Sequence, residues 1–279
     1  MVDTQILSIV TFIYLGGFLA YLIHLLTGKP FIGLLGTVAL AAGFLAHTAA
    51  LLLRWKAAYA VGYNHPPLTN FYESLIFFSW TIILTYMLME WRTRTRILGL
   101  FIVPVAFLAL AFASLSPDMN TRIQPLIPAL QSNWLTSHVL TCFMGYAAFT
   151  TAFGAGVLFM IGDFGKGGAG TSGIRSLIPA PEMLEELIYK SVLLGFILLT
   201  LGIFTGSVWA HYAWGSYWSW DPKETWSLIT WLIYAVLLHG RYVQGWRGRR
   251  LAATALVGFA AVLFTYLGVN YLPGLHSYL

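Results

Sequence analysis

The residues that most clearly indicate ligand binding are the tryptophans of the segment 209–226, whose sequence is WAHYAWGSYWSWDPKETW. The chain has eleven tryptophans, and five of them fall in this one segment. Such a loop offers aromatic faces to a large planar ligand. Tryptophan also favours the boundary between bilayer and water, so an aromatic belt is the structural alternative. A belt scatters its tryptophans over many helix ends, as the other six are scattered. We therefore predict a flat, ligand-binding aromatic surface over 209–226.

The end of this segment carries a helix-start pattern. Asp221 stands at the expected N-cap, Pro222 at the first helical position and Glu224 three residues after the cap. A helix N-terminus attracts anions, so carboxylates of a planar ligand would be directed towards it. Lys223 would then pair with one carboxylate, and a solvated Lys223 is the alternative.

Histidines are the second candidate group. The chain has seven, at His24, His47, His65, His138, His211, His239 and His276. No expected membrane span holds two, whereas subunits with two permanent haems pair their histidines on common helices. His138 begins a span and His276 follows the last one, both at the level of the tryptophan segment. Two imidazoles there would supply axial ligands for a haem iron. A hydrogen-bonded histidine at the membrane surface is the alternative for each residue taken alone.

His239 stands apart from that pair. It follows the tryptophan segment by about fourteen residues, roughly 21 Å along a helix, and therefore lies near the opposite membrane surface. An ionisable residue inside a membrane span is a functional candidate. The alternative is a histidine without a ligand role, whose ring extends to the membrane surface. In the segment His65–Leu75, Asn70 and Glu73 are predicted to form a capping pair for a helix, and a functional role for His65 and Glu73 stays open as the alternative. Cys142 is expected to serve packing alone.

Composition places all of these residues in a membrane protein. The chain is 58% hydrophobic and 9% charged, whereas soluble domains carry about a quarter charged residues. The net charge of +5 therefore says little about nucleic acid, and no nucleic-acid partner is expected. Apolar runs near the roughly 20 residues needed to cross a bilayer recur throughout. We predict one all-α integral membrane domain over 1–279, with about eight transmembrane helices near 5–27, 31–53, 71–91, 97–115, 135–161, 187–209, 225–242 and 251–272.

Positive residues predict the orientation of these spans. Alternate connections hold Lys29, Arg92, Arg94, Arg96, Lys166, Arg175, Arg241, Arg247, Arg249 and Arg250, while the opposite set holds only Arg54, Lys56, Arg122 and Lys223. Cytoplasmic loops are enriched in Lys and Arg. Both termini and the tryptophan segment are therefore expected outside the cytoplasm, with a cytoplasmic linker over 163–187. This linker contains a formal G-x-G-x-x-G match, but no strand precedes it, so we exclude a dinucleotide site.

The run Trp214–Trp226, together with His65–Leu75 and the eight spans, resembles the CcsA (ResC-like) family of cytochrome c biogenesis proteins, whose tryptophan-rich signature handles haem. The resemblance covers essentially the whole chain. It implies His138 and His276 as axial ligands of an external haem, and His239 as the histidine of the span after the signature. It also implies a haem surface made by Trp209, Trp214, Trp218, Trp220 and Trp226, with Asp221 and Lys223 beside the propionates.

The implied function is export of haem b and its presentation for thioether attachment to C-x-x-C-H motifs of apocytochrome c. In that reading the chain is the membrane half of a holocytochrome c synthase (haem lyase), and a separate CcsB-type membrane protein is its partner. Two alternatives stay open: a CcmC-like protein that delivers haem without synthase activity, and a redox subunit with permanent haem b. The bacterial cytoplasmic membrane is the expected location, with the plastid thylakoid as the alternative.

Overall fold

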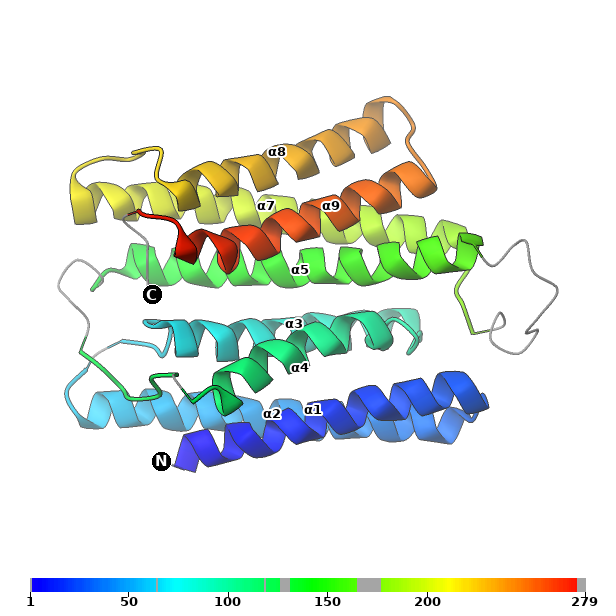
Figure 1. The fold of residues 1–279 in the computed structure, drawn as a ribbon, viewed down its shortest axis with the longest axis horizontal. Helices are drawn as coiled ribbons and strands as arrows, with labels where there is room; N and C mark the ends of the chain where they lie inside the picture. The colour runs from blue at the N-terminus through cyan, green and yellow to red at the C-terminus, as the bar shows by residue number, and fades with distance from the viewer. Residues whose placement is uncertain (1, 64, 118, 126–130, 165–176, 275–279) are drawn as a thin grey trace.

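The computed structural model is all-α in the residues it describes, which are 2–63, 65–117, 119–125, 131–164 and 177–274 (Figure 1). Each predicted span corresponds to one helix. The helices are α1 (Val2–Thr27), α2 (Pro30–Ala60), α3 (Phe71–Thr93), α4 (Gly99–Leu115), α5 (Asn133–Phe164), α7 (Pro181–Trp214), α8 (Pro222–Val243) and α9 (Arg249–Tyr266), followed by the short 3₁₀ helix η3 (Gly268–Tyr271).

Most of these helices have the length and composition of membrane spans. Within the described residues, six of them (α1, α2, α3, α5, α7 and α9) are long and apolar enough to cross a bilayer. The apolar helix α4 has 17 residues, or about 26 Å, against a hydrocarbon core of roughly 30 Å. Helix α8 has 22 residues and carries Lys223, Glu224 and Arg241 near its ends. The prediction of an all-helical membrane fold is confirmed.

Local capping sets where the key helices begin. The Asp221 carboxylate accepts a hydrogen bond from the backbone N–H of Lys223. The Glu224 carboxylate accepts one from the backbone N–H of Asp221, as the sequence predicted. Asn70 caps α3 by accepting from the Glu73 N–H at 2.8 Å. These bonds satisfy backbone donors that have no partner inside the helix.

Two helices run further than hydropathy indicated. Helix α7 begins at Pro181 and continues to Trp214, where Gly215 ends it with a φ of 78°. Trp209 and Trp214 therefore belong to a helix, and only 215–221 of the predicted loop 209–226 lies between helices. Helix α2 continues to Ala60, which places Arg54 inside a helix and not in a connection. A helix continues as long as its backbone N–H and C=O groups keep their hydrogen bonds, whether or not its side chains are apolar.

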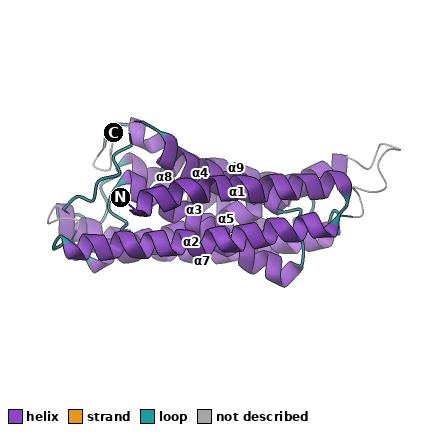
Figure 2. Cartoon of the chain, turned by 90° about the horizontal axis from the view of Figure 1, so that it is seen from below, coloured by secondary structure: helices purple, strands orange, loops and turns teal. Residues whose placement is uncertain are grey.

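The long helices lie side by side in one bundle, with α5 near its middle (Figures 1 and 2). Helix α5 packs along α7 and α9 on one side and against α3 and α4 on the other. Helices α1, α5 and α8 begin at one end of the bundle, and α7 and α9 end there (Figure 1). The sequence-distant His138, tryptophan segment and η3 are thereby brought to the same end.

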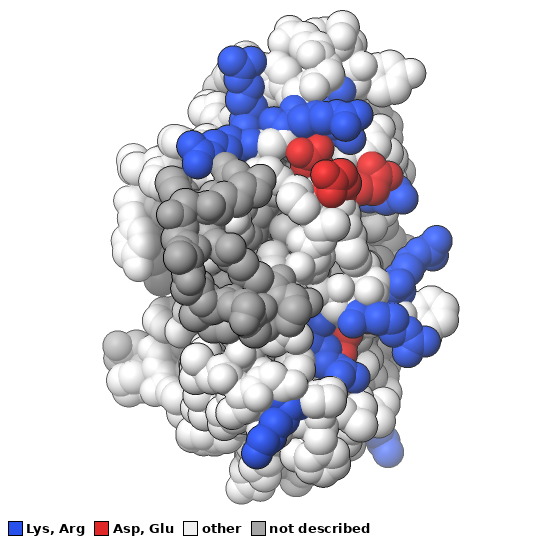
Figure 3. Space-filling model, turned by 90° about the vertical axis from the view of Figure 1, so that its right-hand side faces the viewer, with Lys and Arg blue, Asp and Glu red and all other residues white. Residues whose placement is uncertain are grey.

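The opposite end of the bundle gathers the basic side chains. Figure 3 shows Lys and Arg residues spread over this face. The connections after α1, α3 and α8, which lie at this end, hold Lys29, Arg94, Arg96 and Arg247. Lys166 and Arg175, which the sequence assigned to the same side, lie outside the described residues. The charge sorting required by the predicted orientation is therefore present among the described residues.

One buried charge cluster ties three helices together at the end that holds the tryptophan segment. Arg54 is fully buried and donates to Asp3 of α1 at 3.1 Å and to Glu73 of α3 at 2.8 Å. It also donates to the Thr121 carbonyl oxygen at 3.0 Å. The second Glu73 oxygen accepts from the N–H and hydroxyl of Thr69. Glu73 thus anchors the entry to α3 through these bonds and not as a partner of the Asn70 backbone.

Candidate functional site

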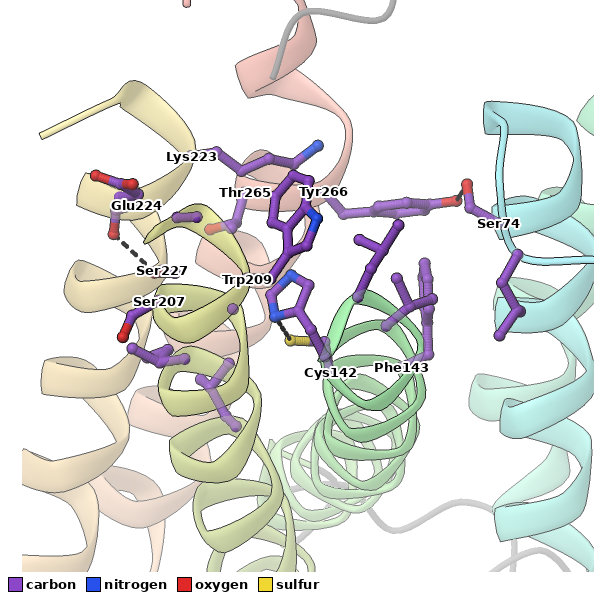
Figure 4. A pocket seen from close by; sticks show the side chains of 18 of the residues that line it. Ser74, Cys142, Phe143, Ser207, Trp209, Lys223, Glu224, Ser227, Thr265 and Tyr266 are labelled. Atoms are coloured by element: carbon purple, nitrogen blue, oxygen red, sulfur yellow. Dashed lines mark hydrogen bonds between the residues drawn. The ribbon is translucent and has the colours of Figure 1, made fainter. Parts of the chain in front are cut away.

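A concavity lined by both polar and aromatic side chains opens at the end that holds the tryptophan segment (Figure 4). We call it the main cavity. It contains about 1250 Å³ of empty space, part of which is open to solvent. Its walls come from the start of α3, the first turns of α5, the last turns of α7, the first turns of α8, and α9 with η3; they include Ser74, His138, Trp209, Lys223 and Tyr266. The mixed lining suits an amphipathic ligand.

His138 is held in one tautomer at the wall of this cavity. Its Nδ1 lies 2.7 Å from the carbonyl oxygen of Gly202. A carbonyl only accepts, so Nδ1 donates, and in the neutral ring the lone pair is on Nε2. Histidines that bind metals are commonly oriented by this kind of bond from the other ring nitrogen. The ring is therefore set up to offer Nε2 to a metal.

Close approach of α7 makes room for that ring. A Cβ added at Gly206 would lie 2.5 Å from His138 Nδ1, and one at Gly202 would lie 2.5 Å from the Cys142 sulfur. Cys142 stands one helical turn after His138, and its sulfur is 3.6 Å from His138 Nδ1. Glycine at these two positions is thus a packing requirement of the histidine and the thiol.

A cation and a buried N–H donor stand elsewhere on the cavity wall. Lys223 donates from Nζ to the Asn270 side-chain oxygen at 3.2 Å, and Asn270 donates in turn to the Tyr266 carbonyl oxygen. The indole N–H of Trp218 is buried and has no hydrogen-bond partner among the described residues. Buried donors are normally satisfied, so this N–H fits the acceptor oxygen of a bound ligand. Lys223 and Trp218 thus each bring to the cavity wall a donor of the kind that carboxylates bind.

The five tryptophans do not form the single flat surface that the sequence predicted. Trp209 and Trp214 meet at 69°, and Trp218 and Trp220 at 89°. Trp209 and Trp218 line the main cavity, whereas Trp214 and Trp220 are exposed. The remaining one, Trp226, packs on Phe264. Residues 209 and 214 are five positions apart on a helix, which turns them about 140° from each other.

The other predicted site residues are distributed as follows. Asp221 caps α8 beside the cavity and is buried. His239 is exposed on α8 near the opposite end of the bundle, in a shallow apolar groove with Leu232, Val236 and Trp246. His276, the second predicted axial ligand, lies outside the described residues.

The sequence did not indicate that several other residues line the main cavity. Cys142 was assigned to packing, yet it lines the main cavity beside His138. The entry to α3 at Thr69 and Asn70 was interpreted as capping alone, and it also forms a wall. Asn270 was not singled out at all. Its signal was present, because an amide inside an apolar run needs a polar partner.

The role of His138 can be tested by a substitution that displaces its ring but keeps the histidine. We expect Gly206→Ala to lower haem affinity by about 10- to 100-fold, the range measured when a ligand loses its orienting partner, because the new methyl occupies the position of the ring. Haem titration of the purified protein measures this. Gly16→Ala is the matched control, since a Cβ at Gly16 meets nothing within 4 Å. Equal affinity in the two variants would contradict the assigned position of the ring.

Known proteins resemble this chain over most of its length. The family model described as cytochrome c assembly protein matches residues 68–276. The cytochrome c biogenesis protein CcsA of Gloeobacter violaceus is 40% identical, over 89% of this chain and 87% of that protein. The CcsA protein of Pyropia yezoensis is 38% identical, over 97% and 96%.

A solved structure shares the fold. The structure titled cytochrome c heme lyase CcmF superposes with a TM-score of 0.73 at 19% identity, covering 95% of this chain and 46% of that one. At this identity the likeness concerns the arrangement of helices. The sequence matches decide the family: the chain belongs to the cytochrome c assembly protein family, as a relative of the CcsA proteins.

Proposed function

We propose that this protein acts in cytochrome c maturation by exporting haem b and presenting it outside the cytoplasm for covalent attachment to C-x-x-C-H motifs. The observation that carries the proposal is the main cavity, where the His138 imidazole, the Trp209 and Trp218 rings and the Lys223 ammonium line one space. These groups match the three parts of haem: an iron that takes nitrogen ligands, a large apolar ring and two carboxylates.

The protein would hold the haem in place while attachment occurs. His138 is the proposed axial ligand on the α5 side, and His276 is proposed as the second. Lys223 and the start of α8 at Asp221 favour the propionates, while Trp209 and Trp218 cover the ring. Each acceptor thiol adds across one vinyl group: the S–H bond breaks, a C–S bond forms, and hydrogen goes to the other vinyl carbon. The protein contributes positioning.

The proposed orientation of the helix bundle in the membrane follows from the Lys and Arg residues at one of its ends. The basic end of the bundle (Figure 3) is proposed to face the cytoplasm, because cytoplasmic loops carry the excess of Lys and Arg. The main cavity then opens outside the cytoplasm. We place the protein in a bacterial cytoplasmic membrane or a plastid thylakoid. A CcsB-type membrane protein is proposed as the partner that completes the synthase.

Reconstitution distinguishes this function from its rivals. The purified protein, with its membrane partner and ferrous haem, is expected to form thioether bonds to a C-x-x-C-H peptide, detected by mass and by the pyridine haemochrome spectrum. Release of unmodified haem to a carrier without attachment would favour a CcmC-like delivery protein. Full, non-exchanging haem occupancy would favour a redox subunit.

His239 is proposed as an intake point for haem on the cytoplasmic side. His239→Ala is expected to lower the haem content of the purified protein several-fold, with an unchanged spectrum for the haem that remains. The reason is its distance from the main cavity, since Lys223 and His239 are about 24 Å apart along α8. Wild-type haem content would contradict the intake role. A changed spectrum at full occupancy would mean that His239 binds the haem of the main cavity.

A further inference from the structure

A second cavity adjoins the main one at the same end of the bundle. We call it the side cavity. It lies between the connection that leads into α3 and the start of α5, and it contains about 1060 Å³ of empty space. The two cavities share the residues Leu68, Thr69, Leu135 and Val139 in their walls. Leu135 and Val139 flank His138 on α5, so the wall between the cavities contains the turn that carries the proposed iron ligand.

The side cavity offers a different chemistry from the main one. Its wall carries the polar side chains of His65, Thr69, Ser132, Asn133 and Thr136. Among the described residues, Tyr63 and His65 are the aromatic rings that line it, and these two stack with planes 9° apart. A porphyrin needs apolar and aromatic walls, whereas a polypeptide backbone needs donors and acceptors. The side cavity therefore fits a peptide segment better than a second haem.

His65 supplies the most specific feature of the side cavity. Its Nδ1 lies 3.1 Å from the Pro66 carbonyl oxygen, so Nδ1 donates and the lone pair of the neutral ring is on Nε2. That Nε2 is buried and has no hydrogen-bond partner among the described residues. A buried acceptor without a donor is unfavourable. A group that donates a hydrogen, such as a thiol S–H, would satisfy this nitrogen.

We infer that the side cavity seats the thiol-bearing segment of the acceptor polypeptide, with His65 Nε2 accepting the hydrogen of a thiol. This inference rests on the proposed function, because joining two substrates requires two adjacent sites. The chemistry is balanced. His65 takes the proton as the sulfur bonds to one vinyl carbon, and the proton is returned to the other vinyl carbon. Neither an oxidant nor a reductant is consumed in this step.

Thiol capture locates the peptide. The probe is a C-x-x-C-H peptide whose first cysteine is activated as a mixed disulfide with thionitrobenzoate, added to the full chain with its partner. A cysteine near the seated peptide displaces thionitrobenzoate and forms a protein–peptide disulfide. Thr136→Cys, which lines only the side cavity, is expected to react about tenfold faster than Ser227→Cys, on the far wall of the main cavity. Gln244→Cys, exposed near the other end, and the wild type with Cys142 alone are controls.

Variants of His65 test the thiol contact. His65→Ala is expected to slow haem attachment by about 10²- to 10⁴-fold, the usual contribution of a group that accepts the proton, with wild-type haem content and spectrum. His65→Gln, whose side-chain carbonyl can accept, is expected to recover part of the rate. An altered haem spectrum in His65→Ala would overturn the inference, because His65 would then serve the haem. An unchanged attachment rate would also overturn it.

The two proposals fail separately. If Thr136→Cys captures the peptide while the wild-type protein attaches no haem, the proposed synthase function is contradicted and the peptide site stays supported. A wild-type protein that attaches haem while Ser227→Cys captures the peptide as fast as Thr136→Cys would contradict the side-cavity inference alone.

Discussion

Replacement of His138 by alanine is expected to abolish cytochrome c maturation. Loss of a partner that merely orients a metal ligand costs 10- to 100-fold in affinity, so loss of the ligand itself is expected to exceed about 100-fold. Added imidazole is expected to restore part of the activity, because a small ligand can enter the space left by the ring beside Gly206. Haem content, the optical spectrum and thioether formation measure these effects. The same result is expected for His276→Ala.

His211→Ala is the matched control for His138→Ala. His211 lies at the same end of the bundle, is exposed and stacks on Tyr217 with planes 5° apart, yet it does not line the main cavity. Its replacement is expected to leave maturation near the wild-type level. Normal maturation in His138→Ala would remove that residue from the site, and equal loss in both variants would make the effect unspecific.

Replacement of Arg54 by methionine is expected to produce the largest loss of stability. The change leaves the buried carboxylates of Asp3 and Glu73 without their cation, and breaking a buried ion pair costs ~3–5 kcal/mol. Thermal unfolding of the detergent-solubilised protein measures the loss. Because Glu73 also holds Thr69, the entry to α3 should loosen and haem affinity should fall with stability.

Two further variants separate the ion pair from a general effect of the substitution. Lys56→Met, two residues along the same helix at an exposed position, is expected to unfold as the wild type does. The triple change Asp3→Asn, Arg54→Met and Glu73→Gln removes all three charges and should recover part of the lost stability. If the triple variant is less stable than Arg54→Met alone, the unpaired carboxylates are not the cause.

The sequence by itself determined the features that depend on near neighbours in the chain. The caps at Asp221 and Asn70 could be predicted because a cap bonds to backbone within three residues. The helices among the described residues follow from the apolar runs, and the placement of Lys29, Arg94 and Arg247 follows from their positions between alternate pairs of those runs. The same order of apolar runs placed the tryptophan segment and the start of the helix that carries His138 at one end of the bundle.

Tertiary structure decided which faces of those helices meet. Each residue turns a helix by about 100°, so hydropathy cannot tell that Trp209 lines the cavity while Trp214 is exposed. The rotation of α7 is set by Gly202 and Gly206 where α5 approaches. The Lys223–Asn270 bond and the burial of Arg54 between Asp3 and Glu73 join residues far apart in the chain. Such pairs exist only once packing has brought their helices together, and no local pattern encodes them.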